Sequence, residues 1–144
     1  MDKINIGFIG AGNMGTAIMK GISASKAGEN IQLFAFDPDT EKIKKLAEYG
    51  VCACADEAEL TEKCRYIFFA VKPQIIGKVI ESAAPAVTSE KVLISIAAGI
   101  TDEFIVSKTI PDAKVILVMP NTPLLLASMV YPESVIIFAE PIKL

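Results

Sequence analysis

The stretch NIGFIGAGNMGTAIMKGI, residues 5–22, decides the fold expected for this chain. It opens as an apolar run, which predicts a strand over 4–9, and continues with the apolar spacing of a helix that packs against a sheet. Between the two, Gly10, Gly12 and Gly15 stand at G-x-G-x-x-G spacing. Such glycines permit a tight turn, a close approach of a diphosphate to the main chain, and close packing of helix on strand. The stretch therefore predicts a dinucleotide-binding loop, with an ordinary tight turn as the alternative interpretation.

Apolar runs alternate with helix-period segments along the rest of the chain. Further strands are expected over 31–36, 51–55, 66–71, 92–98 and 114–119. Helices are expected near Asp39, in the acidic stretch after 51–55, between Pro73 and Pro85, and over 102–109. Repeated strand–helix–strand units pair in parallel through right-handed crossovers. The predicted fold class is therefore α/β, a Rossmann-like, doubly wound and mostly parallel sheet.

The expected organisation is a dinucleotide-binding domain over 1–123 and a C-terminal extension over 124–144. The periodic pattern weakens after Pro123, and one or two added strands are expected in the extension, over 128–131 and 134–138. Exposed apolar residues in this part of the chain would favour association, so we expect a homo-oligomer.

Composition and charge narrow the classes of partner. The 144 residues are 52% hydrophobic, which favours a sheet buried on both faces over a disordered chain. The net charge is −3 and no block of Lys or Arg occurs, which argues against nucleic acid and membrane surfaces as partners. No apolar stretch approaches the ~18 residues needed to cross a bilayer. The first residues lead directly into a strand without the pattern of a secretory signal, so we expect a cytoplasmic protein.

The cysteines are expected to be free thiols with a structural role. Cys52, Cys54 and Cys64 form an odd set, and a free cysteine behaves as a small buried hydrophobe. The Cys-x-Cys spacing would place Cys52 and Cys54 on one face of a strand. The chain contains no histidine, so a metal site is not expected and histidine-based nucleophilic catalysis is excluded.

An acidic residue supports the dinucleotide interpretation. Asp37 ends the second expected strand, close to the ~20-residue offset at which an acid holds the ribose hydroxyls. The alternative is a turn residue ahead of Pro38. A carboxylate there would repel a 2′-phosphate and favour NAD over NADP, and the nearby Lys42, Lys44 and Lys45 would soften that preference.

The ends of the later strands carry further candidate residues. Ligands of doubly wound sheets bind beyond the carboxyl ends of the strands. Ala97, Ala98 and Gly99 would leave a gap lined by main chain for a flat nicotinamide ring, or they would serve ordinary strand-end packing.

Four blocks together resemble one known family. They are GFIGAGNMGTAI (7–18), FAVKP (69–73), SIAAGI (95–100) and MPNTP (119–123). In this order and spacing they are similar to pyrroline-5-carboxylate reductase. The resemblance implies an oxidoreductase of proline biosynthesis that reduces a small imine, 1-pyrroline-5-carboxylate, to L-proline with NAD(P)H.

The resemblance also implies which residues line the NADP or NAD cofactor, in addition to Asp37. They are Gly10, Ala11, Gly12, Asn13, Met14 and Gly15, then Ala70, Val71, Lys72 and Pro73, then Ala97, Ala98 and Gly99, and finally Asn121. Lys72, Asn121 and Thr122 are the candidates near the nicotinamide and the substrate. For Lys72 the alternative is a solvated lysine at a strand end, and for Thr122 a residue that closes the loop before Pro123.

The implied chemistry is compatible with a chain that lacks histidine. A protonated cyclic imine is already electrophilic, so the protein mainly has to orient it against the cofactor, which can be worth about 7–11 kcal/mol. The cofactor supplies the difficult step. The sequence assigns no proton donor.

The chain also departs from the family. Family members usually carry an arginine where Leu117 stands, and small residues and a glycine where Leu124, Leu125 and Leu126 follow. The resemblance implies a helical domain after the nucleotide domain, and no pattern of it is recognisable here. We therefore expect mainly the cofactor-binding half of the enzyme. The alternatives are a catalytically inactive dinucleotide-binding module and another reductase, such as a relative of hydroxyacid dehydrogenases.

Overall fold

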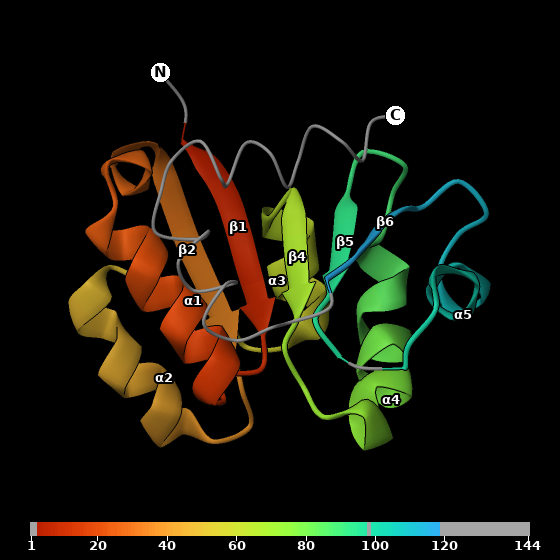
Figure 1. Ribbon diagram of the computed structural model, residues 1–144, viewed down its shortest axis with the longest axis horizontal. Helices are drawn as coiled ribbons and strands as arrows, with labels where there is room; N and C mark the ends of the chain where they lie inside the picture. The colour runs from red at the N-terminus through yellow and green to blue at the C-terminus, as the bar shows by residue number, and fades with distance from the viewer. Residues whose placement is uncertain (1–2, 98, 119–144) are drawn as a thin grey trace.

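The computed structural model describes residues 3–97 and 99–118, which form a six-stranded sheet with helices on both faces (Figure 1). The strands are β1 (Ile4–Ile9), β2 (Ile31–Phe36), β3 (Cys52–Ala53), β4 (Tyr66–Phe69), β5 (Val92–Ser95) and β6 (Lys114–Leu117). Their order is β3-β2-β1-β4-β5-β6, and every neighbouring pair is parallel. The strand order reverses between β1 and β4, so the predicted doubly wound α/β fold is confirmed.

Five α-helices in the described part of the chain lie close to the expected positions. They are α1 (Asn13–Ala24), α2 (Thr40–Leu46), α3 (Glu57–Lys63), α4 (Pro73–Ala83) and α5 (Asp102–Lys108), with 3₁₀ turns at η1 (Lys26–Asn30), η2 (Ala47–Tyr49) and η3 (Ala84–Ala86). The side chains of Asp39, Asp56 and Thr101 cap α2, α3 and α5 by accepting main-chain N–H groups. These caps explain why the helices begin there, since the first N–H groups of a helix have no partner within it.

The two faces of the sheet carry separate hydrophobic clusters because side chains alternate along each strand. Phe8 and Phe68 belong to the cluster under α1 and α2, and their rings stack with centroids 4.4 Å apart. Ile67 and Phe69 point to the other face, where they pack with residues of α3, α4 and α5. The register fixes these assignments, since Phe8 pairs with Phe68 and Ile9 with Phe69 across β1 and β4.

Several strands are shorter than the sequence predicts. The runs expected over 66–71 and 92–98 form strands only as far as Phe69 and Ser95. The third strand, expected over 51–55, has only two residues. It is the edge strand beside β2, so one neighbour alone supplies its hydrogen bonds. The extension over 124–144, with its added strands, and the boundary after residue 123 lie outside the described residues.

The expectation that the cysteines are buried on one strand face is wrong for Cys52. The three thiols are free, but Cys52 is exposed, while Cys54 and Cys64 are buried. Cys54 lies just beyond the end of β3, where it packs with the cluster that includes Leu60 of α3. Because Cys54 lies outside the short strand, the alternation of side chains along a strand does not place Cys52 and Cys54 on the same face.

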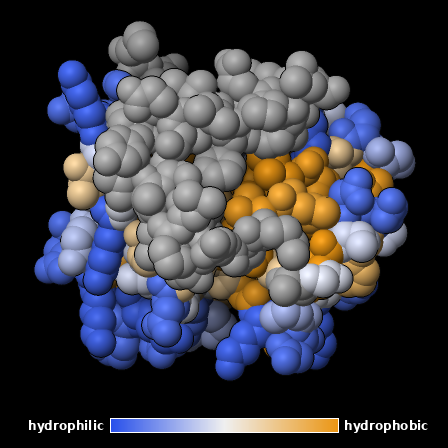
Figure 2. Space-filling view, viewed as in Figure 1, coloured by the Kyte–Doolittle hydropathy of each residue, from blue (hydrophilic) through white to orange (hydrophobic). Residues whose placement is uncertain are grey.

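Among the described residues, no helix covers one face of the sheet over part of its width. In Figure 1, β4, β5 and β6 face the viewer, and no helix of the described residues lies in front of them. Figure 2 shows hydrophobic residues at the surface in this region. Leu117 of β6 is 42% exposed. Within 3–97 and 99–118, no helix is both long and apolar enough to cross a membrane.

Candidate dinucleotide site

The glycine loop begins with a conformation that only glycine adopts readily. Gly10 has φ +104°, and a Cβ atom there would overlap the carbonyl oxygen of Ala70. The N–H of Gly10 donates to the carbonyl of Phe36 at 2.8 Å, and the N–H of Ala70 donates to the carbonyl of Ile9 at 2.8 Å. Gly10 therefore joins the carboxyl ends of β1, β2 and β4 into one tight assembly, as expected for the first glycine of the motif.

Gly12 faces open space. A Cβ atom there would have no neighbour within 4 Å, in contrast to Gly10. Gly12 is also the N-terminal cap residue of α1, and no side chain among the described residues caps this helix. The first N–H groups of a helix lack partners within it and carry partial positive charge. The main chain at Gly12 thus presents donors in a hollow that a side chain would fill, which fits a dinucleotide diphosphate.

Gly15 allows the helix to lie close to the loop. A Cβ atom at Gly15 would come within 2.9 Å of the carbonyl oxygen of Gly10 and 3.1 Å of the Cβ of Ala70. The turn is closed by Thr16, whose hydroxyl donates to the carbonyl of Ala11 at 3.1 Å and whose N–H donates to the carbonyl of Gly12 at 2.9 Å. The three glycines therefore occupy the environments that the motif predicts.

Asp37 lies beside the glycine loop and contacts it directly. Its Oδ2 accepts the N–H of Ala11 at 2.8 Å, and its Oδ1 accepts the N–H of Asp39 at 2.8 Å. The second bond is the turn role considered as the alternative for this residue, and the first ties the end of β2 to the loop after β1. Each carboxylate oxygen can accept more than one hydrogen bond, so contact with a ribose hydroxyl remains compatible with both bonds.

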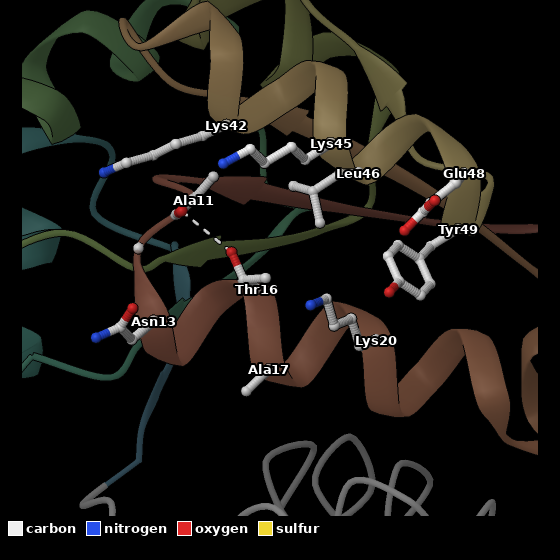
Figure 3. A pocket seen from close by; sticks show the side chains of 11 residues that line it. Ala11, Asn13, Thr16, Ala17, Lys20, Lys42, Lys45, Leu46, Glu48 and Tyr49 are labelled. Carbon is white, nitrogen blue, oxygen red and sulfur yellow. Dashed lines mark hydrogen bonds between the residues drawn. The ribbon is translucent and has the colours of Figure 1, made fainter.

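A cleft of about 540 Å³ runs from the glycine loop between α1 and the α2–η2 segment (Figure 3). Its walls are helix faces: Asn13, Thr16, Ala17 and Lys20 come from α1, and Lys42, Lys45, Leu46, Glu48 and Tyr49 come from α2 and η2. Ala11 and Gly12 close it at the loop end. The hydroxyl of Ser23 donates to the carbonyl of Tyr49 at 3.0 Å and so holds the two walls together.

The second group of predicted residues lies at the same edge of the sheet. Ala70 and Val71 follow β4 and contact the glycine loop, while Lys72 is exposed and is the cap residue of α4, which Pro73 begins. Ala97 follows β5; it is partly buried and packs against the hydrophobic cluster under α3, α4 and α5. Gly99 has φ +78° and open space around it. Ala98, Asn121 and Thr122 lie outside the described residues.

The sequence did not single out several residues that line the cleft. They are Thr16, Ala17, Lys20, Leu46, Glu48 and Tyr49. The signal for one wall was present, because Asn13, Thr16, Ala17 and Lys20 follow the i, i+3, i+4, i+7 spacing of one helix face. That this face lies opposite Lys42 and Lys45 depends on how α1 and α2 pack on the sheet.

Comparisons with known proteins agree with this geometry. A family model described as "NADP oxidoreductase coenzyme F420-dependent" matches residues 5–99. Pyrroline-5-carboxylate reductase 3 of Xenopus laevis is 35% identical over 96% of this chain and 48% of the relative. Pyrroline-5-carboxylate reductase of Escherichia coli is 37% identical over 87% of this chain and 46% of the relative.

Solved structures give the same result. The crystal structure of Plasmodium falciparum pyrroline carboxylate reductase with NADP bound superposes with a TM-score of 0.72 at 32% identity. The match covers 89% of this chain and 46% of that one. The chain thus spans about half the length of the curated relatives it matches. With its fold, glycine loop and matched region together, the chain belongs to the family of NADP oxidoreductases described as coenzyme F420-dependent, and it is similar to the N-terminal half of the pyrroline-5-carboxylate reductases.

Proposed function

We propose that this chain is the cofactor-binding half of a pyrroline-5-carboxylate reductase, which reduces 1-pyrroline-5-carboxylate to L-proline with NAD(P)H. The observation that carries the proposal is the open space at Gly12, at the head of a helix without a side-chain cap and beside the point where the strand order reverses. This is where doubly wound sheets bind nucleotides. The similarity to pyrroline-5-carboxylate reductases over 87–96% of the chain supports the choice of substrate.

The proposal gives each part of the loop a role. The main chain from Gly10 to Gly15 would hold the diphosphate, and Asp37 would fix the loop through Ala11 while it faces the ribose. The bond from Ala11 leaves the later N–H groups of the loop, at the head of α1, as the donors directed at phosphate.

The redox end of the cofactor would lie at the ends of β4 and β5. Ala70, Val71, Lys72 and Pro73 would line one side of the nicotinamide, and Ala97, Ala98 and Gly99 the other, with Asn121 nearby. Lys72, Asn121 and Thr122 remain the candidates for contact with the substrate. Lys72 is exposed at the end of β4, so its ammonium group is accessible to the carboxylate of a substrate.

The chemistry needs orientation more than acid–base catalysis by the protein. When bound, the nicotinamide cofactor supplies the hydride. The imine carbon is electrophilic once its nitrogen is protonated, so the residues of this chain would mainly hold the two reactants in register. A protein that orients the reactants and leaves the hydride transfer to the cofactor does not need a histidine, and the sequence has none.

Two measurements on the chain test the proposal. Calorimetric titration with NADP⁺ and NAD⁺ should show binding, and an assay of proline formation should show little or no turnover by the 144 residues alone. Absence of binding to either nucleotide would overturn the proposal. Robust turnover would show that the chain is more than the cofactor-binding half.

A chimera separates the enzyme from an inactive dinucleotide-binding module. Residues 1–123 are joined to the C-terminal half of the Escherichia coli relative, and proline formation is measured. Activity that disappears with Gly12→Val supports the proposed reductase. A folded chimera that binds nucleotide without turnover favours the inactive module.

A cytoplasmic location, a homo-oligomeric state and the lack of a nucleic-acid partner remain predictions from composition and charge. Sedimentation velocity of the chain at several concentrations would test self-association.

A further inference from the structure

We propose that the amino-terminal edge of the sheet is an anion-binding site for a small polyphosphate, held by basic residues that stand where the strands begin. The site goes beyond the proposed function. It lies at the edge of the sheet opposite the glycine loop, which follows the carboxyl end of β1, as the direction of β1 in Figure 1 shows. The inference does not require a bound dinucleotide.

A basic residue stands at the start of four neighbouring strands. Lys3, Arg65 and Lys91 directly precede β1, β4 and β5, and they are joined by the first residue of β6, Lys114. These strands are consecutive in the sheet, in the order β1-β4-β5-β6, and all are parallel. Neighbouring strands lie about 4.7–4.9 Å apart, so the four residues are spread over only about 15 Å of the sheet's width.

Two hollows of about 350 Å³ each lie along this edge. The basic residues that line the first are Lys3, Lys63, Arg65 and Lys91, and those that line the second are Arg65, Lys91 and Lys114. Together these five residues are called the basic row. Among the described residues that line the two hollows, Glu90 is the only acidic one, and it lines the second. Arg65 and Lys91 line both hollows, so the two hollows form one site with a shared centre.

The positive charges of the basic row are not compensated by ion pairs with other described residues. The ion pairs in the described part of the chain join Lys44 to Glu41 and Lys108 to Glu81, on helices away from this edge. Like charges on neighbouring strands repel each other. An anion with several negative charges would relieve that repulsion at all five residues at once.

Lys91 is held in place at the shared centre by the main chain. Its ammonium group donates to the carbonyl of Cys64 at 2.7 Å and to that of Glu62 at 3.0 Å, and the residue is half-buried. An ammonium group has three N–H donors, and among the described residues no acceptor binds the third. A cation that is already ordered loses little side-chain entropy when it binds a ligand. Lys91 therefore differs from a mobile surface lysine.

Arg65 lies beside Lys91 and favours phosphate as the ligand group. The N–H of Val92 donates to the carbonyl of Arg65 at 2.8 Å, so the residues that precede β4 and β5 are neighbours. The guanidinium of Arg65 lies 5.6 Å from the ring centre of Tyr66. Its planar fork of donors matches the oxygen atoms of a phosphate group. One phosphate at Arg65 and Lys91 would leave the outer cations of both hollows unused, whereas linked phosphates would reach them.

Calorimetric titration with inorganic tripolyphosphate and inorganic phosphate at low ionic strength tests the proposal. We expect tripolyphosphate to bind at least about tenfold more tightly than phosphate. In R65Q/K114Q its affinity should fall at least about tenfold. Both substituted side chains are exposed, and Lys91 is kept because its bonds hold the main chain. Added salt should weaken binding, because exposed charges are screened.

Lys44 and Lys78 provide a matched control. Both are exposed, on α2 and α4, and neither lines the two hollows. K44Q/K78Q removes the same charge as R65Q/K114Q, and the affinity for tripolyphosphate should change by less than about twofold. The glycine loop is a second positive region that attracts phosphate, so the titration is repeated in Gly12→Val and in the presence of excess NADP⁺. Neither should alter the affinity for tripolyphosphate.

The contrary outcomes are distinct. Equal affinities for tripolyphosphate and phosphate, or an equal loss in the two double variants, would show a general attraction to positive charge and would overturn the site. Loss of tripolyphosphate binding in Gly12→Val, or its displacement by NADP⁺, would assign the anion to the glycine loop and would also overturn the inference. Tighter binding of a single-stranded DNA oligomer through the same residues would replace the small polyphosphate by a nucleic-acid backbone. The proposed function is tested separately, because binding of NADP⁺ and NAD⁺ should be unchanged in R65Q/K114Q.

Discussion

The carboxylate of Asp37 accepts the main-chain N–H of Ala11 at 2.8 Å, so the residue that follows β2 holds the loop that follows β1. The two residues are 26 positions apart in the sequence, and Ala11 is buried. The other carboxylate oxygen accepts the N–H of Asp39 at 2.8 Å. The shape of the glycine loop therefore depends on the neighbouring strand as well as on its own glycines.

This relationship predicts the effect of Asp37→Asn. An amide has one acceptor oxygen where the carboxylate has two, so one of the two N–H groups loses its partner. We expect the free energy of unfolding to fall by about 1–3 kcal/mol and the binding of nucleotide to weaken. Denaturant unfolding measures the first effect, and amide hydrogen exchange should show faster exchange at Ala11 or at Asp39, whichever N–H loses its acceptor. Asp39→Asn is the control, because asparagine caps a helix as well as aspartate does. Unchanged exchange at both Ala11 and Asp39 in Asp37→Asn would contradict the prediction.

The glycine loop predicts opposite effects for two similar substitutions. Gly12→Ala adds a Cβ atom in open space at φ −75°, an ordinary backbone angle, so the free energy of unfolding should change by less than about 1 kcal/mol. Nucleotide affinity should nevertheless fall at least about tenfold, because the methyl group would occupy the place proposed for the diphosphate. Calorimetric titration and thermal unfolding on the same sample measure both quantities.

Gly10→Ala should instead destabilise the fold. Its φ of +104° strains any other residue, by about 1–3 kcal/mol, and the new Cβ atom would overlap the carbonyl of Ala70. A marked loss of unfolding free energy is expected in addition to weaker binding. If Gly10→Ala proved as stable as Gly12→Ala, the roles assigned to the two glycines would be wrong.

The cysteines predict a distinct chemical reactivity and pH dependence. Burial raises the pKa of the Cys64 thiol to about 12 and that of Cys54 to about 11, whereas Cys52 is exposed. A thiol reagent at pH 8 should label Cys52 rapidly and the other two only after unfolding. Mass spectrometry of labelled peptides identifies the sites, and Cys52→Ser should abolish the rapid reaction. Rapid labelling of Cys64 in the folded protein would contradict the burial seen here.

The same pKa values determine how stability depends on pH. The thiols of the unfolded chain ionise near pH 9, below the pKa values of about 11 and 12 for the buried thiols of the folded protein. Protonated thiols thus favour the folded state, fully below pH 9, and this contribution is lost as pH rises from 9 through 11–12. The free energy of unfolding should therefore decline over this range, and the decline should be smaller in Cys64→Ala. An equal decline in that variant would count against the prediction.

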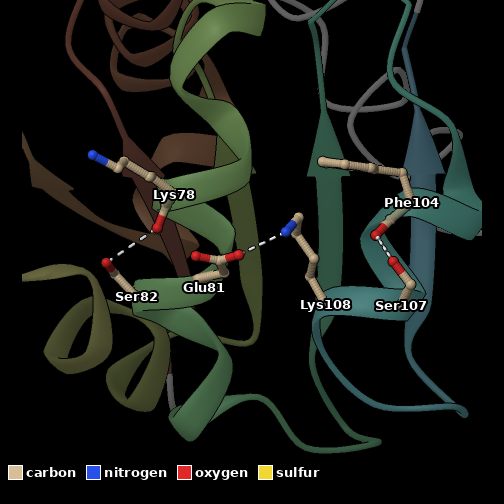
Figure 4. Close-up of polar contacts among 6 residues, drawn as sticks. All are labelled: Lys78, Glu81, Ser82, Phe104, Ser107 and Lys108. Carbon is tan, nitrogen blue, oxygen red and sulfur yellow. Dashed lines mark hydrogen bonds and ion pairs between the residues drawn. The ribbon is translucent and has the colours of Figure 1, made fainter.

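An ion pair joins α4 to α5 on the face opposite α1 (Figure 4). The Lys108 ammonium lies 2.6 Å from a carboxylate oxygen of Glu81, and its hydrogen bond and charge lower the pKa of that carboxyl, with a smaller effect from Lys78. Because the pKa is lower in the folded state, this contribution to stability is present above the ordinary pKa of glutamate and is lost as pH falls through the lowered value. The contribution of this ion pair to stability is small, because the Glu81 side chain is exposed and solvent screens the charges.

Lys108→Gln tests the assignment. The pKa of Glu81, followed by NMR titration, should rise toward its ordinary value, and the variant should lose less stability than the unmodified protein on acidification. Lys78→Gln should give a smaller shift. A larger shift from Lys78→Gln than from Lys108→Gln would show that the pair is not the main cause.

Local patterns in the sequence were sufficient to predict most of the elements and the glycine loop. Apolar spacing identified the helices that begin at Asn13, Thr40 and Pro73, and the buried runs of a doubly wound sheet. Strand ends were less accurate, because a run of apolar residues does not reveal where the chain turns away from the sheet. The run over 66–71, for example, leaves the sheet after Phe69.

The sequence by itself determined the fold class and the position of the glycine loop between β1 and α1, because periodicity and backbone freedom are properties of neighbouring residues. Only the tertiary structure decided that Asp37 binds Ala11, that Lys42 and Lys45 lie opposite the α1 face, and that Cys52 is exposed. These relationships join elements distant in the chain. Periodicity shows which face of its own helix or strand a residue occupies, but strand order, register and helix packing decide what that face meets.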